Sequence, residues 1–472
     1  MAAEVTHYRA AQAWVGGAWQ NDVLLSVGAD GHWCGVEPGA PPAACDAAVL
    51  LDGAVLPGLV NAHSHAFQRA IAGLTERSGA GHDDFWSWRD RMYRAANRIT
   101  PEQLEAIAAL LYAELLQRGY TQVCEFHYLH RAVAGAACAD PMDMSLALLR
   151  AAQRVGIGLT LLPTLYMRSG FDAAGLRADQ QRFAGTPETV LRIAQDLGRH
   201  AQAGSPVNAG IALHSLRAVD PGALLEVDAA TLQRALPLHI HIAEQQQEVA
   251  DCIKRHGQRP IEWLLDHARV DARWNLVHAT HGSGAELQGV QRSGAAVVIC
   301  PSTEANLGDG LFDLSAYAGV AGNWSIGSDS HVTRSWSEEL RLLEYGQRLG
   351  LRQRNIAARS TGVDSSAAAL FNAALAGGPA ATGLALGGIA IGQRADFLVL
   401  DSAAPALLGI APEHRLDALV FSSPDAGFSE VYVAGRRRVA LGRVCAAAGG
   451  DDLWPLLAAD FSAAMHSLWA KA

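Results

Sequence analysis

The chain has 472 residues, of which 50% are hydrophobic and 18% are charged, and its formal net charge is −10. This length predicts a large domain with an accessory module, and the composition argues against a disordered chain. The negative charge argues against a nucleic-acid-binding protein. The sequence has neither a long uncharged apolar run nor a signal-peptide pattern in residues 1–9, so we expect a cytoplasmic protein with no membrane partner.

The cysteines argue against two further kinds of site, and the chain has very few lysines. Seven cysteines are scattered without CxxC spacing, so the sequence predicts neither a disulfide framework nor a cysteine zinc site. Lys254 and Lys471 are the only lysines in the chain.

The predicted elements begin with β-strands. Residues 7–55 are rich in Gly and Val and contain short alternating stretches, which are typical of strands. From residue 56 to about residue 350, short apolar runs alternate with amphipathic segments, the pattern of repeated βα units. Eight such units close into a barrel. The predicted strands are residues 55–60, 121–126, 158–165, 209–214, 238–242, 274–278, 295–300 and 324–327.

Helices are predicted between these strands. Thr100 as N-cap, Pro101 at the first helical position and Gln103 at the third predict a helix to about residue 118. Similar start signals predict helices over residues 187–201 and 336–349. The pattern of residues 383–445 again predicts strands, and that of residues 453–469 predicts a final helix.

The sequence therefore predicts an α/β protein with a (β/α)8 barrel and a small β-sandwich built from both chain ends. We expect residues 1–55 and 383–445 to form the sandwich and residues 56–382 to form the barrel. Residues 446–472 should carry the C-terminal helix.

His63 and His65 follow the first predicted barrel strand. Side chains two residues apart on a strand point the same way, so this pair can hold one metal ion from one side. A surface His pair beside a turn is the alternative. His241 with Glu244, then His278, then Asp329 also follow predicted strands. Since barrel enzymes place their active sites at the carboxyl ends of the strands, these residues predict a metal site there.

These motifs resemble the amidohydrolase superfamily, and within it the deaminase branch. The resemblance rests on PGLVNAHSH at residues 57–65, the His241 and Glu244 pair, His278 and the Gly-Ser-Asp ending at Asp329. A return into the accessory β-domain, GLALGGIAIGQRADFLVLD at residues 383–401, resembles the superfamily as well. The match spans nearly all of the chain.

The resemblance implies one zinc ion per subunit, with His63, His65, His241 and Asp329 as ligands. Many two-metal members use a carbamylated lysine, and neither lysine of this chain is placed to serve. His239, one step deeper on the strand of His241, is expected to be a hydrogen-bonded core residue. The family also suggests a homodimer.

The predicted mechanism assigns three catalytic residues. Zinc lowers the pKa of the water that it binds. Asp329 would take the proton of that water, and Glu244 would protonate the imine nitrogen and then the departing amine. His278 would hydrogen-bond the attacking oxygen, unless it is merely a buried core histidine. Glu244 lies three residues after His241, so a turn must bring its side chain back to the metal.

Residues 68–70, 83–93, 125–128 and 212–217 resemble those of superfamily members that act on N-formimidoyl-L-glutamate. This resemblance implies hydrolysis of that substrate to N-formyl-L-glutamate and ammonia. A dicarboxylate needs planar cationic donors, which arginine supplies. The expected substrate-binding residues are Gln68, Arg89, Tyr128, His214 and Arg217.

Other readings remain open at this point. Any single arginine can instead be a solvated surface residue. The nearest alternative function is a zinc-dependent deaminase or chlorohydrolase of a purine or other heteroaromatic ring. A barrel that has lost catalysis is a second alternative, although no expected ligand is missing from the sequence. Iron or manganese could also occupy such a site.

Overall fold

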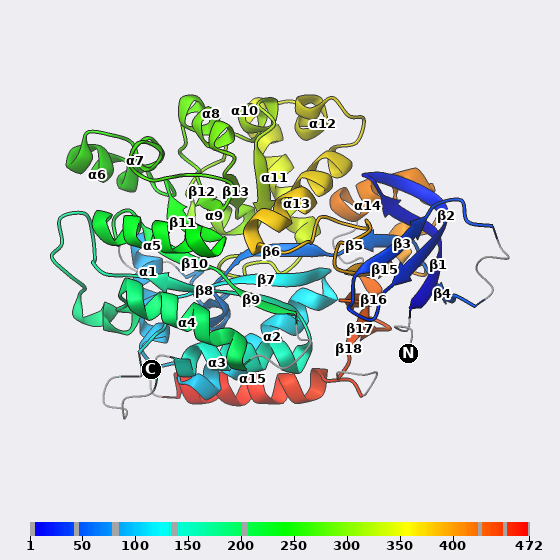
Figure 1. Ribbon diagram of the computed structural model, residues 1–472, viewed down its shortest axis with the longest axis horizontal. Coiled ribbons are helices and arrows are strands. Elements are labelled where there is room, and N and C mark those ends of the chain that lie inside the picture. Colours follow the sequence, from blue (N-terminus) through cyan, green and yellow to red (C-terminus); the bar gives the residue numbers. More distant parts are fainter. Residues whose placement is uncertain are drawn as a thin grey trace.

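The computed structural model describes residues 5–41, 47–77, 85–131, 133, 140, 142–200, 206–422, 427–446 and 451–470. They form a helix-covered barrel with a β-sheet domain at one side (Figure 1). The predicted barrel with an accessory β-domain from both chain ends is confirmed; the accessory domain, predicted as a small β-sandwich, is one mixed sheet.

The barrel consists of eight principal parallel strands that follow one another around the sheet in chain order. Strands β7 (Tyr120–His127) and β8 (Gly158–Leu165) are buried along their whole length, as expected for parallel strands that helices cover on the outside. A short strand, β9 (Val207–Ala209), pairs with β8. The principal strands are β6 (Leu59–Ser64), β7 (Tyr120–His127), β8 (Gly158–Leu165), β10 (Ile211–Ser215), β11 (Leu238–Ile242), β12 (Trp274–His278), β13 (Ala296–Ile299) and β14 (Asn323–Ile326).

The seam between the last barrel strand and the first is joined just past β14. The Asp329 amide donates to the His63 carbonyl at 3.0 Å, and the His65 amide donates to the Asp329 carbonyl at 3.2 Å. The resulting bridge pairs Ser64 with Asp329 in parallel. Residues predicted as metal ligands therefore also contribute the main-chain bonds that close the barrel.

Helices surround the barrel and follow its strands (Figure 1). The predicted start at Thr100 is confirmed, with a capping box between Thr100 and Gln103. The helices of this part are α1 (Phe85–Ala96), α2 (Pro101–Gln117), α3 (Met142–Val155), α4 (Pro187–His200), α5 (Pro221–Arg234), α6 (Gln246–His256), α7 (Pro260–His267), α8 (Gly284–Ser293), α9 (Pro301–Leu307), α10 (Leu314–Gly319), α11 (Trp336–Leu351), α12 (Ile356–Thr361) and α13 (Ser366–Thr382), with the 3-10 turns η2 (Ala66–Ala70) and η3 (Ala178–Phe183).

The strand predicted over residues 55–60 is instead two strands. Residues 55–57 form β5 (Val55–Pro57), which pairs with the β-domain, and the barrel strand β6 begins at Leu59. Gly58 lies between them, where a Cβ atom would come within 2.4 Å of the Thr121 side chain. A continuous apolar run in the sequence does not reveal this change of sheet.

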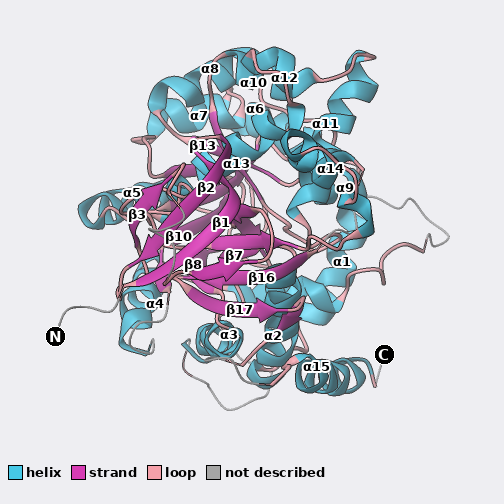
Figure 2. Cartoon of the chain, turned by 90° about the vertical axis from the view of Figure 1, so that its right-hand side faces the viewer, coloured by secondary structure: helices cyan, strands magenta, loops and turns pink. Residues whose placement is uncertain are grey.

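The β-domain is one nine-stranded mixed sheet from both chain ends (Figure 2). The sheet curls, as one ring contact shows. Three strands, β5, β1 and β2, lie between β15 (Phe397–Leu400) and β3 (Trp33–Glu37) in the pairing order, yet the ring centroids of Trp33 and Phe397 are 5.4 Å apart. Tyr8 joins the same core. The strands are β1 (Thr6–Val15), β2 (Ala18–Val27), β3 (Trp33–Glu37), β4 (Val49–Leu51), β5, β15 (Phe397–Leu400), β16 (Phe428–Val433), β17 (Arg436–Ala440) and β18 (Arg443–Val444).

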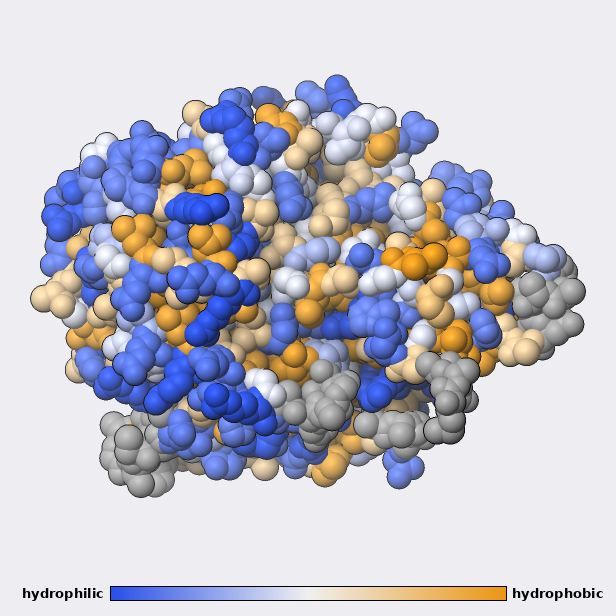
Figure 3. Space-filling view, viewed as in Figure 1, coloured by the Kyte–Doolittle hydropathy of each residue, from blue (hydrophilic) through white to orange (hydrophobic). Residues whose placement is uncertain are grey.

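The remaining helical segments are η4 (Pro405–Leu407), η5 (Pro412–His414), α14 (Arg415–Phe421) and α15 (Trp454–Trp469). Helix α15 runs beside α2, and Gln103 of α2 donates to the Ser467 hydroxyl at 2.6 Å (Figure 1). The molecular face in Figure 3 is largely hydrophilic, with hydrophobic residues scattered among the polar ones. Among the described helices, none combines the length and the apolar character that crossing a membrane requires.

Candidate active site

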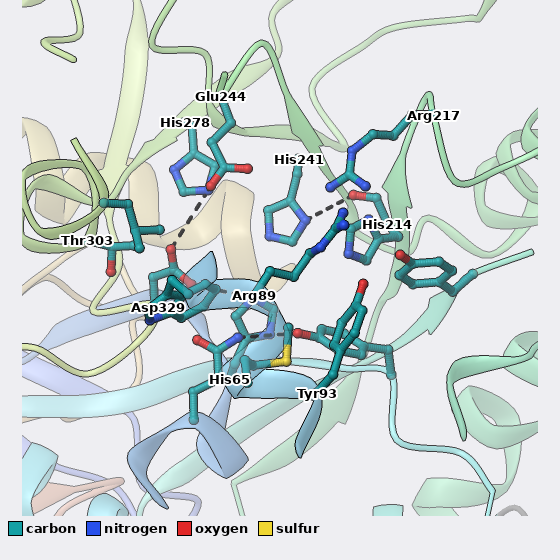
Figure 4. Close-up of a pocket in the computed structure, with 16 residues that line it drawn as sticks. His65, Arg89, Tyr93, His214, Arg217, His241, Glu244, His278, Thr303 and Asp329 are labelled. Carbon is teal, nitrogen blue, oxygen red and sulfur yellow. Dashed lines mark hydrogen bonds and ion pairs between the residues drawn. The ribbon is translucent and has the colours of Figure 1, made fainter. Parts of the chain in front are cut away.

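A pocket opens at the carboxyl ends of the barrel strands, where the sequence places its histidines and acids. Acidic groups and imidazoles lie along one side of it, and arginines lie toward the other (Figure 4). Sixteen residues line the pocket: His65, Gln68, Trp88, Arg89, Met92, Tyr93, Tyr128, Tyr166, His214, Arg217, His241, Glu244, His278, Thr303, Leu307 and Asp329.

Three imidazoles converge at the base of this pocket. The Nε2 atom of His63 lies 3.1 Å from Nε2 of His65 and 3.0 Å from Nε2 of His241. Asp329 Oδ1 lies 3.5 Å from the His63 nitrogen and 3.4 Å from the His65 nitrogen. His63 is fully buried and lies beneath the pocket lining.

The outer hydrogen bonds of the rings fix their tautomers. His65 Nδ1 donates to the Phe126 carbonyl at 2.9 Å, and His241 Nδ1 donates to the His214 carbonyl at the same distance. A carbonyl can only accept, so each neutral ring keeps its hydrogen on Nδ1 and turns a lone pair inward on Nε2. The single Nε2 of His63 cannot donate to both partners at once. A cation between these nitrogens relieves the repulsion of their lone pairs.

The pKa shifts of these groups also favour a cation at this position. Burial lowers the pKa of His63 to about 3 and also lowers the pKa values of His65 and His241, which keeps the rings neutral, as metal ligands must be. Burial alone would raise the pKa of Asp329, but His63 and His65 outweigh it, and the net shift is downward. Three neutral imidazoles and one carboxylate form a donor set that suits a divalent ion.

Glu244 reaches the pocket through a turn in an uncommon conformation. Ala243, directly after β11, has φ +52°, in the left-handed region. The Glu244 amide then donates to Glu248 Oε2 at 3.1 Å, which anchors the turn. This geometry supplies the reversal that the spacing from His241 required. Burial raises the pKa of Glu244 to about 7, so its carboxyl carries a proton near neutrality.

His278 joins Glu244 to Asp329 at the end of β12. Its Nε2 lies 3.6 Å from Glu244 Oε1 and 3.8 Å from Asp329 Oδ2 (Figure 4). Its Nδ1 lies 3.3 Å from Glu304 Oε1, which also accepts the Cys300 amide at 2.9 Å. Burial alone would lower the pKa of His278, but the surrounding carboxylates outweigh it and raise the pKa.

The strand ends carry backbone strain that aims these side chains. His278 has φ +71° and Asp329 has φ +46°, although neither is glycine. Such conformations cost about 1–3 kcal/mol each and concentrate at functional sites. The chain turns sharply at both residues and leaves their side chains facing the pocket.

Two arginines lie toward the other side of the pocket. Arg217 follows β10, and Arg89 comes from α1; Figure 4 shows both guanidinium groups directed into the space between the labelled residues. Burial lowers the pKa of Arg89, and Arg217 is among the neighbouring charges that lower it further. Two like charges in a common pocket favour an anionic ligand.

The structure brings together every residue for which the sequence predicted a role. The predicted catalytic residues and all five predicted substrate-binding residues line one pocket, and His63 lies beneath it. Their roles remain predictions. His239 lies outside the pocket lining, and its Nε2 lies 2.9 Å from the Ala381 carbonyl, which confirms it as a hydrogen-bonded core residue. Lys254 is exposed on α6, and Lys471 lies outside the described residues.

Sequence reasoning missed several lining residues and the partner of His278. Glu304 lies on the short helix α9 and shows no metal-ligand spacing, although its place just after β13 could have indicated it. Tyr93 and Tyr166 are single aromatic residues, and no local sequence pattern separates them from core residues. The missed lining residues are Trp88, Met92, Tyr93, Tyr166, Thr303 and Leu307.

Comparison with known proteins places these features in a family. The model of the amidohydrolase family matches residues 54–438. Formimidoylglutamate deiminase of Pseudomonas aeruginosa is 47% identical over 425 residues, covering 90% of this chain and 92% of its own length.

Solved structures agree with this match. A crystal structure of an amidohydrolase from Brucella melitensis, 40% identical, superposes with a TM-score of 0.89 over 98% of this chain and 99% of its own. Atrazine chlorohydrolase from Arthrobacter aurescens, complexed with zinc, is 18% identical with a TM-score of 0.83 over 98% and 100% of the two chains, and it shares the fold. The buried His/Asp cluster of the present chain is a metal-binding site of this fold. The chain belongs to the amidohydrolase family.

Proposed function

We propose that this chain is a deiminase that hydrolyses N-formimidoyl-L-glutamate to N-formyl-L-glutamate and ammonia. The observation that carries the proposal is one pocket that joins a metal-ligand cluster to two arginines, Arg89 and Arg217. The proposed substrate has a hydrolysable amidine carbon and two carboxylates, which match these two ends. The 47% identity with a formimidoylglutamate deiminase over 90% of the chain supports the same assignment.

We propose one zinc ion per subunit, held by His63, His65, His241 and Asp329. When bound, zinc supplies hydroxide near neutral pH, because it lowers the pKa of water. The neutral rings and the charged carboxylate described above are ligand types that zinc takes in proteins. A homodimer stays a prediction.

The proton transfers fall to two carboxyl groups. Asp329 faces the convergence of the imidazoles and accepts a proton from the attacking water. Glu244, whose pKa is raised to about 7 by burial, donates its proton to the imine nitrogen of the substrate. Glu244, now a carboxylate, takes the remaining hydrogen of the added oxygen and passes it to the terminal nitrogen. The bond between the formimidoyl carbon and that nitrogen then breaks and ammonia leaves, while the proton held by Asp329 returns to Glu244. The formyl carbonyl remains on the glutamate nitrogen.

His278 acts on the attacking oxygen. Its Nε2 faces Glu244 and Asp329, so it can hydrogen-bond the oxygen as the tetrahedral centre forms. Glu304 accepts from Nδ1 and holds the ring in this orientation. We assign Glu304 a positioning role, because it lies on the far side of the ring from the pocket lining.

The carboxylates of the substrate bind at the arginine end. Arg217 and Arg89 supply charged donors, which form shorter and stronger hydrogen bonds to carboxylates than neutral donors do. Tyr128, whose hydroxyl accepts from Gln68 at 3.2 Å, and His214 complete the expected binding set. Heteroaromatic rings such as purines carry no comparable pair of anions, so the two arginines favour the amidine acid.

The test is ammonia release from N-formimidoyl-L-glutamate by the purified protein. We expect release that a chelator abolishes and zinc restores, with little turnover of guanine or adenosine. Guanine or adenosine turnover without deimination would replace the proposal with the heteroaromatic alternative. A zinc-loaded protein that leaves N-formimidoyl-L-glutamate intact would overturn the assignment of the substrate.

A further inference from the structure

Gln180 links two tyrosines at the wall of the pocket. It is fully buried on η3, and its Nε2 donates to the Tyr93 hydroxyl at 3.0 Å and to the Tyr166 hydroxyl at 3.1 Å. Tyr93 lies on α1, and Tyr166 directly follows β8. One amide therefore joins three segments that are distant in sequence.

The orientation of the Gln180 amide follows from its third contact. The other polar atom of the Gln180 side chain lies 3.0 Å from the backbone nitrogen of Arg177. That amide can only donate, so the atom facing it must be the accepting oxygen Oε1. The NH2 group consequently faces the tyrosines, and each tyrosine oxygen is an acceptor toward Gln180.

The tyrosine hydrogens are then available for other partners. Each hydroxyl keeps its own hydrogen, because Gln180 Nε2 is the donor in both contacts. Burial, with Tyr93 as the next cause, raises the pKa of the Tyr166 phenol, so that hydroxyl stays protonated. Both tyrosines line the pocket, where a hydroxyl hydrogen can meet a ligand.

The surroundings of the pair favour an anion. The Arg89 guanidinium carbon lies 5.5 Å from the Tyr93 ring centroid, and the positive charges of Arg217 and Arg89 act on Tyr166. Tyr93 lies with Arg89, Arg217 and His214 in Figure 4, away from Asp329 and Thr303. A neutral donor beside two cations can complete the coordination of a carboxylate.

We propose that the Tyr93–Tyr166 hydroxyl pair, oriented by Gln180, donates a hydrogen bond to one carboxylate of the substrate and so contributes to specificity for a dicarboxylate. This inference rests on the proposed deiminase function. Gln180 touches no substrate and acts as a positioning residue.

The experiment compares Tyr93→Phe, Tyr166→Phe and the double variant on three compounds. These are N-formimidoyl-L-glutamate, N-formimidoyl-4-aminobutyrate, which lacks the α-carboxylate, and N-formimidoyl-L-norvaline, which lacks the side-chain carboxylate. Loss of a hydrogen bond to a charged group should raise KM for the dicarboxylate by about tenfold, with zinc content retained. The effect should disappear with the analogue that lacks the contacted carboxylate, and inhibition constants replace KM for any analogue that is not hydrolysed.

Non-additivity identifies the pair as one unit. The double variant should be little worse than the poorer single variant, because either change breaks the same chain of hydrogen bonds. Gln180→Met should raise KM in the wild-type background and add little to the double variant. Tyr120→Phe is the matched control, since Tyr120 is buried outside the pocket and its hydroxyl has no hydrogen-bond partner among the described residues.

Two results would overturn the inference, and they differ from failure of the proposed function. Unchanged KM in both tyrosine variants excludes the donor. An equal loss on all three compounds means that the tyrosines serve structure alone. If wild-type protein does not deiminate N-formimidoyl-L-glutamate, the proposed function fails and this inference falls with it.

Discussion

The two ends of the pocket are built in different ways. At the metal end, the side chains come from strand ends whose main-chain bonds hold them in place; His63, His65 and Asp329 are tied together at the barrel seam. At the arginine end, α1 supplies Arg89 and the turn after β10 supplies Arg217. One end is part of the barrel wall, and the other is assembled from connecting segments.

This difference separates chemistry from recognition. A rigid strand-end cluster suits reactions that depend on fixed geometry, because small displacements of catalytic groups are costly. Loops and peripheral helices vary more readily among relatives, so recognition can change without disturbing the cluster. The two ends should therefore respond differently to substitution.

Removing a metal ligand should have the largest effect. We expect His241→Ala to lose zinc and to lower kcat by about a thousandfold or more, because the ion contributes several kcal/mol to the reaction. Metal content and ammonia release measure both consequences. His239→Gln is the matched control, since it replaces a buried histidine on the same strand that hydrogen-bonds the Ala381 carbonyl and lies outside the pocket lining. Full activity of His241→Ala would remove this residue from the metal site.

Removing an arginine should have a smaller effect that leaves the metal in place. We expect Arg217→Ala to lower kcat/KM for N-formimidoyl-L-glutamate at least about tenfold with zinc retained, because a charged hydrogen bond to a carboxylate is lost. Steady-state kinetics with metal analysis make the comparison. Arg199→Ala on the exposed face of α4 is the control. Loss of zinc in Arg217→Ala would show that the two ends are not independent.

The smallest expected effect concerns pH. Burial, followed by charges that include Asp329 and Glu248, places the pKa of Glu244 at about 7. An acid must be protonated, so kcat should fall as pH rises through this value. Glu248→Gln removes one negative neighbour while keeping an acceptor for the Glu244 amide. The alkaline limb of the pH profile should then move to lower pH by a fraction of a unit, and an unmoved limb would exclude Glu248 as a cause of the shift.

The sequence predicted the metal end well because its signals are local. His63 and His65 share a strand face, and each of the other ligands directly follows a buried run of residues. Start signals also predicted that a helix begins at Pro101, and apolar runs predicted the strands β8, β11 and β12 with their bounds. The split at Gly58 was missed, because an apolar run reads the same whether it stays in one sheet or crosses to another.

The arginine end was predicted only in part, and largely through the family resemblance. Its geometry depends on contacts across long sequence separations, such as those of Gln180 with Tyr93 and Tyr166. A single buried glutamine carries no local pattern, so its role could not be inferred before the fold placed it. Glu304 is similar, since nothing in its neighbours along the chain indicates His278 as its partner.

The main-chain geometry at Asp329 limits how this protein can change over evolution. The bonds that close the seam use its amide and carbonyl, so replacing the side chain leaves them intact. Its φ of +46° is a conformation that asparagine and glycine adopt readily and β-branched residues avoid. A descendant could thus exchange the carboxylate for an amide or a hydrogen and still form a closed barrel. A valine or isoleucine at the same position would disturb the architecture itself, whatever reaction the pocket had come to perform.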